Sequence, residues 1–576
     1  MRSLLIFSLS ILSLVSAAQN KFETVFEKSN GTQTPTYFQI IKWWKNLDAA
    51  SSIVQMKEMG PSDAGLPIHL VMVSGDKDFN IKSLKEKKRN IILINNGIHP
   101  GEPDGIDASM LLVKDIVQGK YLLPSNIVLA LIPVYNIGGS LNRSSNYRVD
   151  QNGPEEFGFR GNAQNLDLNR DFIKADSRNA FTFSKIFHYL DPDVFVDNHV
   201  SNGADYQHVM TLIASQHNRL GGEMGRFMNQ QFEPGLYTLM KEKGYDLVPY
   251  VNHFGETPDK GWSEFWDSPR YSSGYASLWN TFAFVPETHM LKPYPQRVAA
   301  TKALMESFIS FTNKNSQAIT KLRLDAKSQL LKQQEYTSKW ALDKTRFSEI
   351  TYKGYEAGKK TSEISGLPRL YYDRSKPFEI KVPFYNYYKG SIKIVRPKAY
   401  IIPQGWWKVI ERLQVNNVTM LRLQKDTIME VEWYSITGYQ ASTRLYEGHH
   451  INSNVQVSKQ QSTISFRKGD YYIPLNQAAN RFIVEVLEPT MEDSYFTWNF
   501  FDPILNQKEG FSDYVFEETA LAYLKTNPAL KEKLEQTRNS DSAFAKSAAA
   551  QLNFIYRNSP YYEPAHMRYP VYRVLK

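Results

Sequence analysis

The stretch RNIILINNGIHPGEPDGIDASMLLVKDIVQG (residues 89–119) decides the fold predicted for this chain. It begins with a continuous apolar run, which is typical of a strand buried on both faces. After the turn NNGIHPGEP, apolar residues recur at helical spacing, and Gly119 follows them as a C-terminal cap. The helical stripe consists of Ile106, Met110, Val113 and Val117. A strand, a turn and a helix in this order indicate one unit of an α/β layer.

The same alternation continues on both sides of this stretch, through residues 36–312. Further strands are expected within PIHLVMVSG (67–75), SNIVLALIPVYN (125–136), DPDVFVDNHVS (191–201) and NTFAFVPETHM (280–290). Helices are expected within TYFQIIKWWKNL (36–47) and DSRNAFTFSKIFHYL (176–190), with a long helical stretch over 298–336. Apolar strands that alternate with amphipathic helices predict a parallel or mixed sheet covered by helices.

A second region begins at about residue 341, where the sequence pattern changes. Short aromatic strands are expected within 370–390, 427–439 and FIVEVLEP (482–489), with one helix within GWWKVIERL (405–413) and an Ala/Lys-rich helical tail. The predicted boundaries are therefore a first region over 19–340, with its core at 36–312, and a second region over 341–576.

Length and composition allow two large cores, because the chain has 576 residues of which 42% are hydrophobic. The opening residues MRSLLIFSLSILSLVSAAQN predict a signal peptide over 1–18, with a membrane anchor as the alternative. We therefore expect an exported protein, periplasmic or extracellular, that does not span the membrane. The formal charge of +9 is widely spread, which disfavours a nucleic-acid partner and leaves contact with anionic cell-wall material open. The chain contains no cysteine, which excludes thiol catalysis.

Three residues at strand ends are candidate metal ligands. His99 and Glu102 share one turn, and His199 follows a distant strand of the same predicted sheet. A catalytic zinc typically takes imidazole nitrogens and a carboxylate and leaves its fourth position to water. Each residue also has an ordinary explanation, since a strand-end histidine can be a core residue and Glu102 can favour a helix N-terminus.

Two further stretches add polar groups to the same edge of the sheet. FRGNAQNLDLNRDF (159–172) gathers Arg160, Asp167, Asn169 and Arg170 in one loop, which suits a carboxylate or a developing oxyanion. Glu287 ends an otherwise apolar strand, where a carboxylate is costly as structure and useful as a general base.

In combination, these features resemble the zinc carboxypeptidases, the metallocarboxypeptidases with a funnel-shaped α/β fold. The matching residues, in order, are His99-Pro-Gly-Glu102, LDLNRDF, His199 and Glu287. The resemblance covers residues 36–312 and implies a three-layer α/β domain with a mixed central sheet in the first region. The pattern of the second region independently predicts a mostly β domain with a helical tail. The resemblance also implies one Zn²⁺ per chain and a peptide substrate with a free C-terminal carboxylate.

The roles of individual residues also follow from this resemblance. His99, Glu102 and His199 match the metal ligands, and Asp167 matches the carboxylate that orients the first ligand histidine. Glu287 matches the general base, and Arg160 matches the arginine that faces the oxyanion. Asn169 and Arg170 match the pair that binds the substrate carboxylate, and Tyr271 is the candidate for the tyrosine that covers the substrate.

Several alternatives stay open at this point. Arg270 is a candidate for the pocket of the substrate's last side chain, or else a surface or structural arginine. Trimming of cell-wall peptide stems by an amidase or carboxypeptidase is a second enzymatic reading. A noncatalytic wall- or glycan-binding protein is the third, in which the adjacent Trp406 and Trp407 serve as a binding surface or as core and interface.

Overall fold

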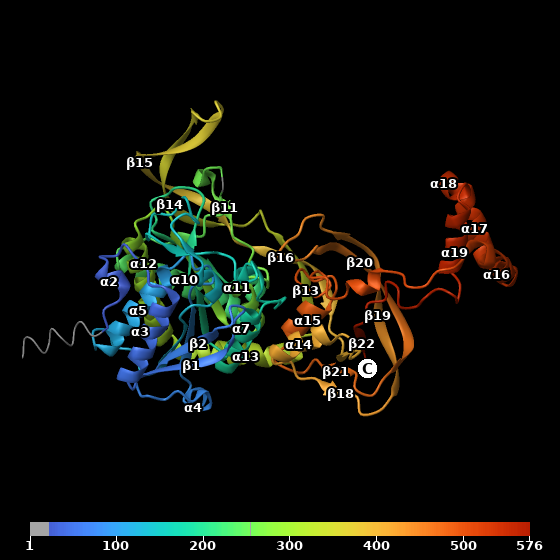
Figure 1. Ribbon diagram of the computed structural model, residues 1–576, viewed down its shortest axis with the longest axis horizontal. Helices are drawn as coiled ribbons and strands as arrows, with labels where there is room; N and C mark the ends of the chain where they lie inside the picture. Colours follow the sequence, from blue (N-terminus) through green and yellow to red (C-terminus); the bar gives the residue numbers. More distant parts are fainter. Residues whose placement is uncertain (1–21, 254, 576) are drawn as a thin grey trace, which may run out of the picture.

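The computed structural model describes residues 22–253 and 255–575 of the chain (Figure 1). The predicted signal peptide lies outside the described residues. Within the described ranges, no helix combines the length and the apolar character needed to cross a membrane.

The centre of the first region is a mixed nine-stranded sheet with the order β1-β2-β4-β3-β7-β12-β9-β10, in which β8 also pairs with β12. Its strands are β1 (Val54–Pro61), β2 (Pro67–Val73), β3 (Asn90–Asn95), β4 (Ile127–Ile132), β7 (Val194–Asp197), β8 (His199–Ser201), β9 (Met210–Ala214), β10 (Val248–Pro249) and β12 (Phe282–His289). The inner strands β4, β3, β7 and β12 run parallel, whereas β1 pairs antiparallel with β2, β2 with β4, and β9 with β12; β10 pairs parallel with β9. The predicted mixed sheet is confirmed.

Helices cover both faces of this sheet, which completes the three layers. On one side lie α5 (Asp104–Val117) and α12 (Tyr294–Lys314), and α12 packs on β3, β4, β9 and β12. On the other side lie α7 (Arg178–Leu190) and α11 (Ser272–Leu278), which pack on β1 and β2 and on β7 and β12, respectively (Figure 1).

The helix α5 follows its predicted pattern closely. Ile106, Met110 and Val113 are buried, Val117 is partly buried, and the helix ends before Gly119, whose φ is 72°. That left-handed conformation costs glycine nothing, which is why it ends the helix there. The helix expected within 36–47 is α3 (Tyr37–Ala50), which buries Tyr37, Ile40 and Trp44.

The long helical stretch expected over 298–336 is two helices. After α12 the chain turns at Asn315 and continues as α13 (Ser316–Lys332), which gives way to β13 (Glu335–Leu342). The boundary expected at 340/341 falls inside this strand and stays a prediction.

The second region contains a six-stranded sheet with the order β18-β21-β17-β22-β19-β20. Its strands are β17 (Ala399–Ile402), β18 (Leu421–Arg422), β19 (Thr427–Ala441), β20 (Asn452–Phe466), β21 (Tyr471–Pro474) and β22 (Tyr572–Val574). The expected helix is α14 (Trp407–Val415), and the expected tail is α16 (Asp513–Thr526) to α19 (Ala548–Arg557), which stands apart at the far end of the molecule (Figure 1). The mostly β character and the helical tail are confirmed.

One element of the second region was predicted wrongly. FIVEVLEP forms the helix α15 (Asn480–Leu487), in which Phe482, Ile483 and Val486 are all buried. A short apolar run buried on every side has no periodicity to distinguish a helix from a strand. The side chain of Phe482 stacks on Trp279 of the first region at 5.3 Å between ring centroids, so the two regions share one hydrophobic core.

Candidate metal centre and active site

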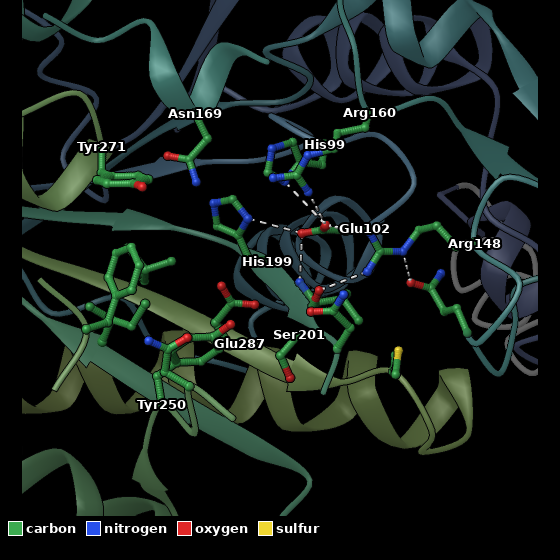
Figure 2. Close-up of a pocket in the computed structure, with 18 of the residues that line it drawn as sticks. His99, Glu102, Arg148, Arg160, Asn169, His199, Ser201, Tyr250, Tyr271 and Glu287 are labelled. Carbon is green, nitrogen blue, oxygen red and sulfur yellow. Dashed lines mark hydrogen bonds and ion pairs between the residues drawn. The ribbon is translucent and has the colours of Figure 1, made fainter. Parts of the chain in front are cut away.

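The side chains of the candidate ligands point toward one another (Figure 2). They come from the edge of the sheet that the parallel strands β3, β7 and β12 share. His99 and Glu102 lie in the turn between β3 and α5, and His199 opens β8. One ligand atom from each residue lies within 4.8 Å of the others, and each residue is at most 4% exposed. The turn can pack this tightly because residue 101 is glycine, whose missing Cβ would stand 2.8 Å from the side chain of Arg148.

Each of the two imidazoles is bound at Nε2 by a carboxylate, which leaves its Nδ1 facing the candidate metal position. The Nε2 of His99 donates to Asp167 Oδ1 at 2.9 Å, and the Nε2 of His199 donates to Asp197 Oδ2 at 3.3 Å. The two Nδ1 atoms therefore point toward Glu102, at 3.3 and 3.1 Å from its oxygens. This carboxylate–histidine arrangement is the one that fixes tautomer and orientation in metal sites.

The donor set fits a zinc ion. The Nδ1 of His99 is buried without a hydrogen-bond partner, a state that costs free energy unless a metal or water satisfies it. Two imidazoles and one carboxylate are the protein ligands of a catalytic zinc. Burial alone would raise the pKa of Glu102, but Arg148 and His99 outweigh it and hold that pKa well below its usual range, so the carboxylate is ionised.

Glu287 lies directly beside the ligands, because its strand pairs with β8 in the register Glu287–His199. Burial raises the pKa of Glu287 to about 7, and the Glu102 carboxylate adds to this effect while His199 opposes it. A carboxyl group with such a pKa can take up and release a proton near neutral pH.

The other predicted residues gather around the same cavity of about 590 Å³. Arg160 donates from Nε to Asp167 Oδ2 at 3.0 Å, and its Nη1 lies 3.5 Å from Glu102 Oε1. Figure 2 shows Asn169 and Tyr271 at the opposite end of the cavity. The guanidinium of Arg170 lies 4.6 Å from the ring centre of Tyr271. The Oδ1 of Asn169 faces the same end without a hydrogen-bond partner.

The structure thus places the predicted site residues at one cavity, with Asp167 behind its wall. The cavity lining includes His99, Glu102, Arg160, Asn169, Arg170, His199, Tyr271 and Glu287.

Arg270, by contrast, is absent from the cavity lining. Its guanidinium donates to the carboxylate of Asp493 in the second region at 2.7 and 2.8 Å. The backbone N–H of Arg270 donates to the same carboxylate. The structural alternative for Arg270 is confirmed.

Sequence reasoning missed three residues of this site. Arg148 donates to Glu102 Oε1 at 2.7 Å and to the carbonyl of Val200, which braces both sides of the metal centre. Asp197 had a signal, since it precedes a candidate ligand by two residues at a strand end. Arg148 and the cavity residue Tyr250 had none, because only the folded chain brings them to the site.

Comparisons with known proteins agree with the geometry. Residues 40–215 match a family model described as zinc carboxypeptidase, which confirms over that stretch the resemblance predicted from the motifs. The match includes the three candidate ligands, and Glu287 and Tyr271 lie beyond it. A zinc carboxypeptidase implies Zn²⁺, and His99, Glu102 and His199 can hold it.

Proteins with a similar sequence are named as carboxypeptidases. Carboxypeptidase 2 of Trichophyton rubrum is 29% identical over 100 residues, which are 17% of this chain and 18% of that protein. Probable carboxypeptidase 2 of Arthroderma benhamiae is 29% identical over 98 residues. The chain thus matches less than a fifth of the length of these relatives. Among solved structures, a metallo-carboxypeptidase from Pseudomonas aeruginosa aligns at 16% identity and a TM-score of 0.36, over 49% of this chain and 69% of that one.

Proposed function

We propose that this chain, which matches the zinc carboxypeptidases over residues 40–215, is a zinc-dependent metallocarboxypeptidase that removes C-terminal residues from peptides. The observation that carries the proposal is the convergence of His99, Glu102 and His199, with Glu287 paired in register beside them. Burial of this set of charged groups costs free energy. A role in catalysis accounts for that cost, which disfavours the alternative of a noncatalytic binding protein.

Zinc bound by His99, Glu102 and His199 would acidify a water molecule and polarise the scissile carbonyl. Glu287 accepts the proton of the attacking water and passes it to the leaving amine, as its pKa of about 7 allows. Arg160, whose side chain is 44% exposed at the cavity, donates hydrogen bonds to the oxyanion that develops on the carbonyl oxygen.

The other end of the cavity accounts for the choice of the terminal peptide bond. Arg170 and Asn169 present a guanidinium and an amide that can hold a free carboxylate, and Tyr271 lies against Arg170. A site built to bind a charged terminal group rejects a substrate that lacks it, because its own polar groups are then left unpaired.

A direct test uses the purified full-length protein, a metal analysis and two peptides that differ only at the C-terminus. We expect about one equivalent of zinc per chain, release of single residues from the free acid and no release from the C-terminal amide. Equal cleavage of both peptides would overturn the exopeptidase assignment, and absence of zinc would overturn the metal assignment.

Glu287→Gln separates catalysis from metal binding in the same assay. The variant should retain its zinc and lose activity by about 10²- to 10⁴-fold, because the amide cannot accept the proton. Glu242→Gln, at an exposed position on α10 (Glu233–Glu242), is the matched control and should behave as the unaltered protein. Full activity in Glu287→Gln would remove the general-base role.

We also propose that the protein is exported and acts in the periplasm or outside the cell. The support is the amino-acid pattern of residues 1–18, and the net charge of +9 would favour contact with anionic wall material. Amino-terminal sequencing of protein recovered from the cell envelope and the medium should show cleavage near residue 18. An intact amino terminus in the cytosolic fraction would contradict export.

A further inference from the structure

A hairpin of the second region reaches the wall of the metal centre. The strands β19 and β20 are joined by residues 442–451, in which Tyr446 and His449 exchange two backbone hydrogen bonds of 2.8 and 3.1 Å. The two residues between them, Glu447 and Gly448, have φ values of 50° and 82°. Positive φ at both central positions is the signature of the tight type I′ turn. We call residues 446–449 the tip turn.

The Glu447 side chain of the tip turn contacts the metal centre through one residue. Its Oε2 accepts a hydrogen bond of 2.7 Å from the backbone N–H of Asp167. The carboxylate of Asp167 in turn accepts from the Nε2 of His99. Glu447 is therefore linked to the candidate zinc ligand His99 by two consecutive hydrogen bonds, the first of which spans 280 positions of sequence.

Contacts on both sides of Glu447 hold the tip turn against the first region. The Nε2 of His449 donates to Asp176 Oδ2 at 2.7 Å, and Arg412 donates to the other oxygen of that carboxylate at 3.0 Å. The ring of Tyr446 lies 5.6 Å from the guanidinium carbon of Arg270, which Asp493 fixes in place. A turn anchored at both flanks has little freedom to move away from Asp167.

We propose that Glu447 is a positioning residue of the metal centre. It holds the backbone of Asp167 so that the Asp167 carboxylate keeps the imidazole of His99 aimed at the metal. The inference rests on the proposed zinc site and extends it, because it makes the second region a part of that site. Groups that orient a ligand histidine are known to affect metal affinity although they never touch the metal.

The test measures zinc affinity of the full-length protein by competition with a chelating dye, together with the melting temperature of the zinc-free protein. Glu447→Ala removes the acceptor for the Asp167 N–H and should lower zinc affinity about tenfold. Glu447→Gln keeps an acceptor oxygen and should restore affinity to within about threefold of the unaltered protein. Glu430→Gln, at an exposed position on β19 of the same hairpin, is the matched control.

Unchanged zinc affinity in Glu447→Ala would overturn the inference. The inference would also be overturned if the Ala and Gln variants lost zinc affinity equally and the zinc-free protein melted at a lower temperature in both. The role of Glu447 would then be merely structural. If the unaltered protein binds zinc but releases no residue from peptides, the proposed function fails while the affinity comparison still decides the role of Glu447. If it binds no zinc, both fail.

Discussion

The two ends of the cavity are built in different ways. The metal-ligand end, formed by His99, Glu102 and His199, lies on and next to strands, and its residues are at most 4% exposed. The carboxylate end, formed by Asn169, Arg170 and Tyr271, lies on a short helical turn and a loop, where the Arg170 side chain is 22% exposed. Metal ligands need fixed positions, whereas groups that meet a substrate need access from solvent.

The two ends also differ in what braces them. The metal-ligand end is held within the first region by Asp197 and Arg148, and from outside by Glu447 through Asp167. Beside the carboxylate end, Asp493 of the second region holds Arg270, the residue before Tyr271. Strand residues fix the metal ligands directly, whereas the loops around the cavity are held by contacts with the second region.

The largest effect should come from removing a ligand of the metal-ligand end. His199→Ala takes away one of three ligand atoms, so zinc binding and hydrolysis should both be lost, with activity down by more than about 10³-fold. Metal analysis and residue release from a peptide measure the two losses. His566→Ala, in the segment after α19, is the control. Retained stoichiometric zinc in His199→Ala would break the assignment of this end.

A smaller effect should come from the carboxylate end. Arg170→Ala removes charge-assisted hydrogen bonds of about 1.5–3 kcal/mol, so kcat/KM should fall about 10- to 150-fold. Zinc content should stay unchanged, because Arg170 contacts none of the proposed ligands. Arg178→Ala, on the same segment of chain at the start of α7, is the matched control. A parallel loss of zinc would show that the two ends are not separate.

The brace behind His199 should have an effect of similar or smaller size. Asp197→Asn keeps the shape of the side chain but removes the charge facing Nε2, so zinc affinity should fall about 10- to 100-fold. Competition with a chelating dye measures it, and Asp325→Asn on α13 is the control. Unchanged affinity would show that the sheet alone fixes His199.

The smallest effect on zinc binding and hydrolysis should come from Asp107, a buried acid in α5, whose substitution should change the pH dependence of stability instead. Burial raises the pKa of Asp107 to about 7, although Thr34 and Tyr294 donate to its carboxylate at 2.6 and 2.5 Å. Between about pH 4 and 7 the folded protein therefore holds a proton that the unfolded chain has released. Its free energy of unfolding should fall as pH rises through this window, by at most about 1.4 kcal/mol per pH unit.

Asp107→Asn should remove this slope and leave zinc binding and hydrolysis unchanged. Urea unfolding between pH 4 and 7 measures the difference, with Asp115→Asn, at a partly exposed position on the same helix, as the control. An identical slope in the Asn variant would show that Asp107 is ionised in the folded protein.

The predictability of the fold followed the strength of local patterns. The strands β2, β3 and β4 are apolar runs that end at turns, the helices α5 and α7 have a clear helical period, and all five were found. The strands β1, β9 and β10 were missed, since β1 is polar and half-exposed and β10 has only two residues. FIVEVLEP was assigned to the wrong state because burial on all sides erases the period that distinguishes a helix from a strand.

The sequence by itself determined the candidate ligands, since His99 and Glu102 share one turn and His199 and Glu287 end apolar strands. Only the tertiary structure decided that Arg148 and Asp197 brace them, that Arg270 pairs with Asp493, and that Glu447 contacts Asp167. The physical reason is the range of the interactions. Periodicity and turn chemistry act between near neighbours in the chain, whereas a hydrogen bond across 280 positions depends on how separate elements pack.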